Sequence, residues 1–218
     1  NSTASYNVGM GWAALGANTI GHSNTGLGHA ALYLNVEGVG NTAVGFATLD
    51  ANTASSNTAV GYNSLTANQD GAENTGVGIN TLSTNVSGTG NVALGYQALY
   101  TNTASHNVAV GYNALVLNQA GTQNVSVGAY ALDANTTASY NTAMGYGALG
   151  TNQTGAGNVA IGTQALAACT DDYNVVIGAD AQPQSSSSEK CVSIGNLAGY
   201  QISTGDNNIS IGTDAARS

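Results

Sequence analysis

Few residues of this chain could take part in acid–base, nucleophilic or metal chemistry. Its 218 residues include eleven acidic residues, three histidines, two cysteines and two basic residues. His22, His29 and His106 share no metal-ligand spacing with a pair of carboxylates. No carboxylate pair recurs where it could form a glycosidase cleft, and no Ser-His-Asp set, phosphate-binding loop or dinucleotide fingerprint occurs. We therefore predict no catalytic residue, metal or cofactor, and no enzymatic activity.

The charge balance excludes two classes of partner. The two cations, Lys190 and Arg217, stand against a net charge of −9. They cannot form a basic patch for nucleic acid or for an anionic membrane surface. No apolar run is long enough to span a bilayer as a helix, so we expect no membrane insertion. Because the chain begins inside a repeat, we expect it to be part of a longer or processed protein.

An aromatic column is the first candidate binding feature. It follows a recurring glycine and is interrupted at His29, Ile79, Ala129 and Thr163. Its members are Trp12, Phe46, Tyr62, Tyr96, Tyr112 and Tyr146. Aromatic rings of this kind could bind glycan faces, or they could pack along an edge of the fold or between chains.

The elements that position these residues come from a tandem repeat. Phrases such as NTAVGFATL (41–49) and NVAVGYNAL (107–115) recur in thirteen copies, with a period of about 16–17 residues. A second Asn follows at a constant interval after the first in most copies, and only the segment after it varies in length. A fixed half and a variable half indicate a rigid unit joined by exposed loops.

Column periodicity predicts the fold class. The first Asn of each copy is followed by a β-branched residue, a small residue, an aliphatic residue or Met, and Gly. This alternation is typical of a short strand that ends at a glycine bend. A small residue and Leu follow, as at Ala14–Leu15 and Ser64–Leu65, and predict a second strand. We expect an all-β parallel β-solenoid of about 13 coils, with two short strands in each coil.

The two faces of the first strand suggest where the chain associates. We expect the β-branched and aliphatic columns to point into the core. The small column would then face outward, where another backbone could approach closely. We therefore predict that a homo-oligomer packs on this small column. The residues assigned to that oligomer face are Ala43, Ala59, Gly76, Ala93, Ala109, Ala143 and Ala160.

The two asparagine columns and the cysteines favour structural roles. Stacked Asn side chains can form hydrogen-bonded ladders, and Asn also tolerates left-handed turns. Cys169 and Cys191 each replace a columnar Asn and are separated by one coil and one loop. They could form a disulfide, or they could be two buried thiols.

The domain organisation is expected to be simple. We predict one repeat domain over residues 1–218, with an irregular loop at 181–190 that contains the only Pro. The repeat resumes in phase at Val192, and the Leu column is lost in the last three copies.

The phrases NVAIGTQAL (158–166) and NVAVGYNAL (107–115) resemble the head repeats of YadA-like trimeric autotransporter adhesins and the repeats of phage tail fibres. The resemblance covers nearly the whole chain. It implies a left-handed β-roll, three chains around one axis, an extracellular location on a virion fibre or cell surface, and attachment to a surface. The coil of this chain is longer than the family's usual coil.

These observations lead to one expected function and two alternatives. We expect a non-enzymatic fibre segment that associates with itself as a homotrimer, or end to end as a filament, and that attaches to a host-surface glycan or protein. One alternative is a carbohydrate-binding module that uses the aromatic column. The other is an ice-binding solenoid, which would need a regular Thr array; here Val interrupts the Thr column, and we expect that column to face the core.

Overall fold

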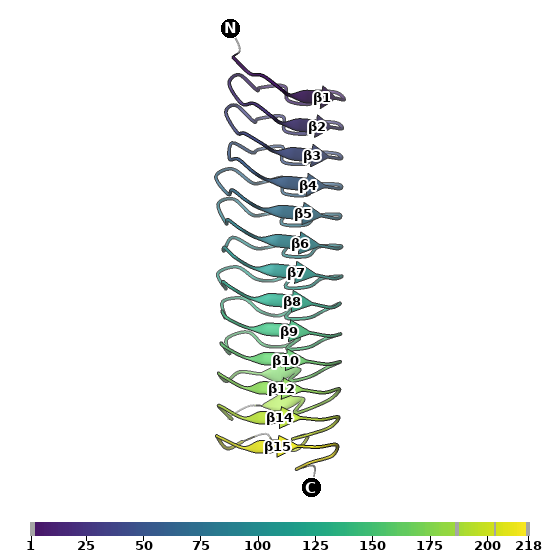
Figure 1. Cartoon of the computed structure of the whole chain (residues 1–218), viewed down its shortest axis with the longest axis vertical. Coiled ribbons are helices and arrows are strands. Elements are labelled where there is room, and N and C mark those ends of the chain that lie inside the picture. The colour runs from purple at the N-terminus through teal and green to yellow at the C-terminus, as the bar shows by residue number, and fades with distance from the viewer. Residues whose placement is uncertain (1–2, 186–187, 203, 217–218) are drawn as a thin grey trace. The chain divides into compact units, whose positions relative to one another are not determined.

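The computed structural model describes residues 3–185, 188–202 and 204–216. By its internal contacts the chain forms two compact units, Asn1–Asn107 and Val108–Ser218. Each unit is an all-β solenoid in which every coil of the repeat contributes one parallel strand of three residues (Figure 1). The expected fold class, an all-β parallel β-solenoid, is therefore confirmed.

The strands of the first unit pair in sequence order and in register. Residues of one column lie opposite each other, as at Thr25↔Thr42 and Leu27↔Val44. The strands are β1 (Val8–Met10), β2 (Thr25–Leu27), β3 (Thr42–Val44), β4 (Thr58–Val60), β5 (Thr75–Val77) and β6 (Val92–Leu94).

The second unit repeats this arrangement and adds a small second sheet. Its main strands are β7 (Val108–Val110), β8 (Val125–Val127), β9 (Thr142–Met144), β10 (Val159–Ile161), β12 (Val175–Ile177), β14 (Val192–Ile194) and β15 (Ile209–Ile211). Two further strands, β11 (Ala168–Cys169) and β13 (Gln184–Ser185), pair with each other in parallel. β13 lies inside the predicted irregular loop at 181–190, of which residues 186–187 are outside the described residues.

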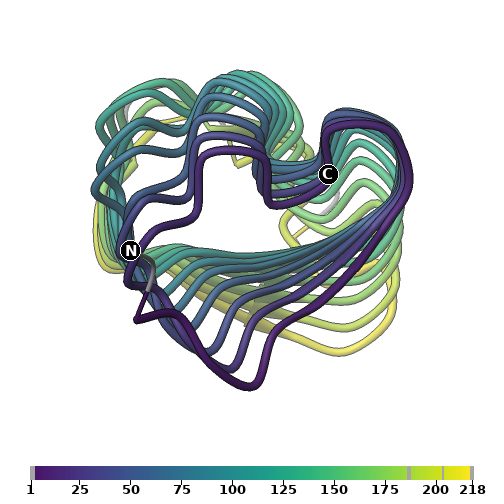
Figure 2. The same ribbon diagram turned by 90° about the horizontal axis from the view of Figure 1, so that it is seen from above.

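The prediction of a second strand at the small residue and Leu of each coil is wrong; β11 and β13 begin three residues after the small residue of their coils. The small residue and Leu lie in a turn, and the ten leucines of this column have φ between 48° and 55°. The coils still stack there, because Leu65 N–H donates to Thr81 O at 2.9 Å in the next coil. Figure 2 shows the same bends repeated from coil to coil within each unit.

A left-handed Leu is unfavourable by about 1–2 kcal/mol. Leu32, Leu49 and Leu65 are fully buried, and burial of such a side chain contributes about 1.5–3 kcal/mol. The burial therefore offsets the backbone strain. The left-handed turn points the Leu side chain into the interior, whereas successive side chains of a straight strand would alternate between its two faces.

The faces of the main strands are the reverse of the prediction. The middle, small residue of the strand is buried, whereas the β-branched and aliphatic residues on either side of it are partly or fully exposed. The interior is narrow: a Cβ added at Gly76 would lie 2.6 Å from Ser64 Oγ and 3.5 Å from Leu65 Cδ1. Only a small residue fits opposite the Leu.

The predicted oligomer face is therefore corrected. Its side chains line the inside of single coils and cannot contact another copy. The residues concerned are Ala43, Ala59, Gly76, Ala93, Ala109, Ala143 and Ala160.

The first asparagine column connects each coil to the next. Asn74 Oδ1 accepts a hydrogen bond from Asn91 N–H at 2.9 Å, and Asn74 Nδ2 donates to Gly88 O at 2.8 Å. The same backbone-to-side-chain bond recurs in the second unit, where Asn158 N–H donates to Asn141 Oδ1 at 2.9 Å. The side chain thus satisfies a buried backbone donor and a loop carbonyl that no strand partner reaches.

The second asparagine column forms a side-chain ladder. Asn68 Nδ2 donates to Asn52 Oδ1 at 2.7 Å, and Asn85 Nδ2 donates to Asn68 Oδ1 at 2.9 Å. Asn68 Nδ2 also donates to Gly71 O at 2.8 Å within its own loop. The prediction of hydrogen-bonded Asn ladders is confirmed for these buried residues.

Removing one amide of the first column should destabilise the fold. We expect Asn74→Ala to lower the free energy of unfolding by about 3 kcal/mol, because a buried N–H and a buried carbonyl lose their partners. The exposed Gln69→Ala should change it by less than about 0.5 kcal/mol. Urea unfolding followed by circular dichroism measures both, and equal stabilities of the two variants would contradict the role of the column.

The glycine that ends each strand should resist substitution more than a loop glycine does. Gly61 has φ +132°, and an added Cβ would overlap the carbonyl oxygen of Gly78 in the next coil. Gly40 has φ +68° with nothing within 4 Å of an added Cβ. We expect Gly61→Ala to cost about 3 kcal/mol or more and Gly40→Ala about 1 kcal/mol. Thermal unfolding of the pair checks this order, which would be wrong if Gly40→Ala were the less stable variant.

Candidate functional site

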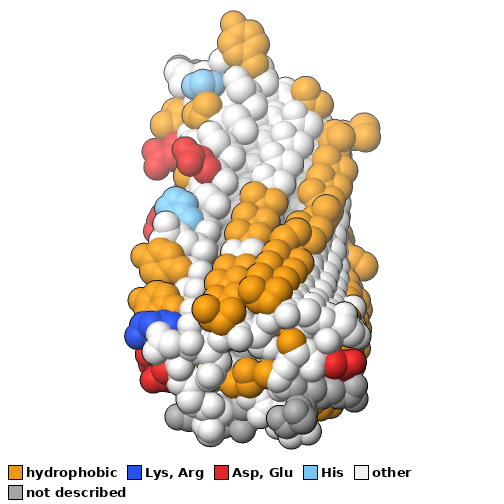
Figure 3. Space-filling model, turned by 60° about the horizontal axis from the view of Figure 1, so that its bottom comes forward, with side chains coloured by type: hydrophobic (Ala, Val, Ile, Leu, Met, Phe, Trp, Pro, Cys, Tyr) orange, Lys and Arg blue, Asp and Glu red, His pale blue; other side chains and the backbone are white. Residues whose placement is uncertain are grey.

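The strands expose an uncharged surface. We define the outer sheet face as the first and third residues of each main strand, all of which are Thr, Val, Ile, Leu or Met. In the first unit Val92 and Leu94 are 38% and 46% exposed, and in the second unit Met144 is 42% exposed. Figure 3 shows hydrophobic side chains of this kind in adjacent rows on the surface. Such a face can bury apolar area without directional bonds.

The outer sheet face also carries the Thr column, contrary to the expectation that this column faces the core. Thr25, Thr42, Thr58 and Thr75 lie side by side in register, and Val92 ends the run. The neighbouring column on the same face is aliphatic. The face is therefore no regular hydroxyl array.

In the first unit the aromatic column is a stack of rings. His29 lies between Trp12 and Phe46, with ring centroids 4.7 Å from each, and Phe46 lies 5.2 Å from Tyr62. The interplanar angles are 9–20°. His29 continues the column that the sequence pattern treats as broken there. Both faces of the His29 and Phe46 rings are covered by their neighbours, so these rings offer their edges to a ligand.

In the second unit the tyrosines are arranged differently. Tyr130 makes edge contacts with Tyr112 and Tyr146 at centroid distances of 5.3 and 5.8 Å and interplanar angles of 62° and 78°. The sequence pattern missed Tyr130, since Ala129 occupies the column itself. Partial burial and the neighbouring Tyr112 raise the pKa of Tyr130. The sequence signal that could have found Tyr130 is an aromatic residue one position after the break at Ala129.

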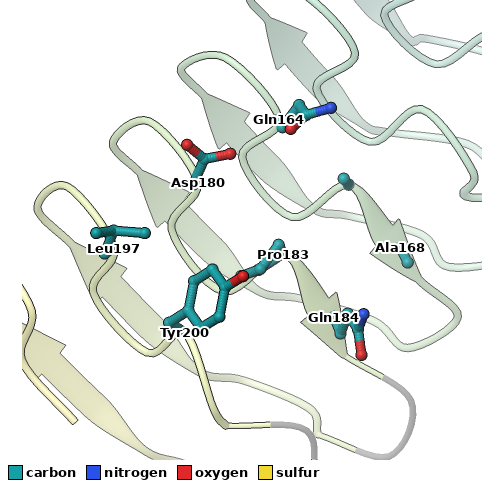
Figure 4. Close-up of a pocket in the computed structure, with 8 residues that line it drawn as sticks. Gln164, Ala168, Asp180, Pro183, Gln184, Leu197 and Tyr200 are labelled. Carbon is teal, nitrogen blue, oxygen red and sulfur yellow. The ribbon is translucent and has the colours of Figure 1, made fainter. Parts of the chain in front are cut away.

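Beside these tyrosines the second unit has three adjoining hollows, which we call the lateral groove. Their volumes are about 350, 470 and 250 Å³. The first is lined by Tyr130, Asp133, Tyr146, Gly147, Gly150, Thr151, Gln164 and Ala167. The second is lined by Gln164, Ala167, Ala168, Asp180, Pro183, Gln184, Leu197 and Tyr200 (Figure 4). The third is lined by Pro183, Gln184, Tyr200 and Gln201.

Two glycines in one coil make the first hollow. Gly147 and Gly150 stand where the preceding coil has Tyr130 and Asp133 and the following coil has Gln164 and Ala167. Asp133 Oδ1 would lie 3.4 Å from a Cβ added at Gly150, so the carboxylate borders the space that this missing side chain leaves. Burial raises the pKa of Asp133.

The predicted polar candidates are dispersed. His29 belongs to the ring stack, whereas His22 and His106 lie in other columns, with His22 Nδ1 3.3 Å from Ser23 Oγ. Across the described residues, no group of three His, Cys, Asp or Glu side chains is arranged to hold a metal ion.

The cysteines are two free, buried thiols, and the disulfide alternative is wrong. Asn174 lies between them: its Nδ2 is 3.8 Å from Cys169 Sγ, and its Oδ1 accepts a hydrogen bond from Cys191 N–H at 3.0 Å. Each thiol occupies an asparagine position and donates to a loop carbonyl, Cys169 Sγ to Asp171 O at 3.3 Å and Cys191 Sγ to Gly205 O at 3.4 Å.

Residues 3–185, 188–202 and 204–216 include no helix, and therefore none that is long and apolar enough to cross a membrane. Compared with known proteins, the chain matches no family model, no curated protein and no solved structure.

The thiol chemistry gives a prediction that depends on pH. Burial raises the pKa of Cys169 to about 11 from an ordinary value near 9. Between pH 9 and 11 the unfolded thiol loses its proton while the folded one keeps it, so stability should fall as pH rises through this range. We expect intact mass spectrometry to find two free thiols, and alkylation of Cys169 in the folded chain to be slow at about pH 8 and faster towards pH 11.

Rapid alkylation of both thiols at the lower pH, or a mass two hydrogens lower that dithiothreitol restores, would contradict this description of the cysteines. Alkylation of the chain unfolded in urea is the control that shows both thiols to be reactive once exposed.

Proposed function

We propose that the chain is a non-enzymatic structural segment of an extracellular fibre, either a homotrimeric phage tail fibre or an adhesin-like surface filament used for attachment. The observation that carries the proposal is the outer sheet face. Such a surface of Thr, Val, Ile, Leu and Met without charge is unfavourable in water and favourable against an apolar partner of matching shape.

A second copy of the chain fits this face better than an unrelated protein. Its rows repeat at the strand spacing of about 4.8 Å, so the rows of two copies match at every coil. Closed symmetry buries the same patch of every copy, and three copies around one axis would cover the face in each of them. The resemblance of the repeat phrases implies the same trimer. The proposed interface is the outer sheet face, in place of the small column.

The repeated coil also supports a mechanical role. Within each unit, most coils are joined to the next by strand pairing, by the turn bond at the Leu and by the two Asn columns. These bonds are short-range and repeat along the unit, which gives length and stiffness without a specialised core. End-to-end joining of such segments would extend the fibre, and electron microscopy of the purified chain distinguishes short trimers from continuous filaments.

A charge on the outer sheet face should break the assembly. We expect wild-type chain at micromolar concentration to have three times the monomer mass in analytical ultracentrifugation. Leu94→Lys should raise the dissociation constant at least about a hundredfold, because each copy would bury an unpaired ammonium group. Ile79→Lys is the matched control: Ile79 is 48% exposed, close to the 46% of Leu94, and lies in the aromatic column off this face.

A wild-type chain that sediments as a monomer at micromolar concentration would overturn the self-association. Equal masses of Leu94→Lys and Ile79→Lys would show that the association uses another surface.

A further inference from the structure

The lateral groove of the second unit is continuous through shared lining residues. Gln164 and Ala167 border both the first and the second hollow, and Pro183, Gln184 and Tyr200 border both the second and the third. The lining runs from the coil of Tyr130 to the coil of Tyr200, four coil steps apart. At about 4.8 Å for each step this is roughly 19 Å, long enough for an extended chain of a few monomer units.

We propose that the lateral groove binds a neutral oligosaccharide in an extended conformation. Sugar rings present apolar C–H faces and a rim of hydroxyl groups, and the groove offers partners for both. Its apolar surfaces come from the tyrosine rings, Pro183 and Leu197, whereas Asp133 and Asp180 provide carboxylate acceptors. The amides of Gln164, Gln184 and Gln201 can both donate and accept hydrogen bonds.

The positions of these groups suit a ligand that runs along the coils. Asp180 and Gln164 project from consecutive coils. Pro183 lies on the same coil as Asp180, and the Tyr200 ring lies beside it on the next coil (Figure 4). Polar and apolar groups thus lie side by side along the groove. A few placed polar groups among apolar walls are the usual composition of a small-molecule site.

Charge decides between neutral and acidic sugars. The two titratable carboxyl groups, Asp133 and Asp180, face the groove, and none of its lining residues is Lys or Arg. Lys190 is the one Lys or Arg among the described residues, and its Nζ lies 3.4 Å from Glu189 Oε2. A sialylated or uronic-acid oligosaccharide would meet only negative charge here, so a neutral one is favoured.

The backbone around the groove argues against an extended peptide. Such a peptide binds by adding a strand, which needs unpaired backbone donors and acceptors at a sheet edge. Here the turn N–H groups are already bonded to the next coil: Leu166 N–H donates to Ala181 O at 3.0 Å, and Gln182 N–H donates to Ala198 O at 2.9 Å. A ligand in the groove would therefore be recognised by side chains, which is how proteins commonly bind sugars.

The groove is independent of the proposed assembly surface. Its main lining comes from the turns that follow the strands, whereas the outer sheet face consists of strand residues. Self-association and sugar binding can therefore fail separately, and the first is measured by mass while the second is measured by ligand titration.

The test is titration calorimetry of the full chain against neutral tri- to hexasaccharides of glucose, galactose, mannose and N-acetylglucosamine, with sialylated and uronic-acid oligosaccharides alongside. We expect saturable binding of at least one neutral oligosaccharide and at least tenfold weaker binding of the acidic ones. Asp133→Asn combined with Asp180→Asn should weaken binding at least tenfold, and Ala167→Trp should abolish it by filling the first two hollows.

Asp50→Asn is the matched control, since Asp50 belongs to the first unit, occupies the column position of Asp133 and lines none of the three hollows. It should leave the affinity unchanged, and all variants should keep the wild-type sedimentation mass and circular dichroism. The proposal is overturned if no neutral oligosaccharide binds, if acidic ones bind more tightly, or if Ala167→Trp and the double variant bind as the wild type does. Binding of an extended proline-containing peptide in place of every sugar would also overturn it.

Discussion

The hydrogen bonds of the first asparagine column are the interaction on which the rest of the structure depends. Each side chain accepts from the backbone N–H of the next column member and donates to a loop carbonyl, so coils of different loop length keep one register. Cys191 shows what the amide provides. Its N–H is still satisfied by Asn174, but its thiol is only a distant partner of Asn208 Nδ2, at 3.9 Å. The first asparagine column is therefore weaker where a thiol replaces the amide.

The fixed register makes the coil interior narrow, and this determines which side chains face outward. Leu fills the interior from a left-handed turn, so the opposite strand can place only Ala, Gly, Ser or one Val inside. The larger residues of the strand must then face outward. The same constraint that packs the single chain therefore produces the apolar surface that we propose for self-association.

Much of the fold was predictable from the sequence, and the failures have local causes. The repeat period, the strand positions and the glycine bends follow directly from the columns. The sequence pattern predicts the strand faces wrongly, because an alternation with a period of two does not say which side of the strand is inside. Residue size suggested that Val and Thr were core, and the left-handed conformation of residues such as Leu65 has no sequence signature, since Leu rarely adopts it.

The candidate sites show the same limit of column patterns. The aromatic pattern treats His29 as a break although its ring continues the stack, and it misses Tyr130 because this residue is one position out of the column. The disulfide alternative overlooked Asn174, which lies between the two cysteines only once the coils are stacked. The lateral groove depends on Gly147 and Gly150 lying beside Asp133 and Gln164 in neighbouring coils, which the folded arrangement brings together.

The most direct test of the central claim, that the β-branched columns face outward and join copies of the chain, is oxidative cross-linking through an introduced thiol. Val60→Cys, with Cys169 and Cys191 buried as they are, should yield a species of twice the monomer mass on a non-reducing gel. Ala59→Cys, one residue away but inside the coil, should yield none. Cross-linking by Ala59→Cys and not by Val60→Cys would contradict the account.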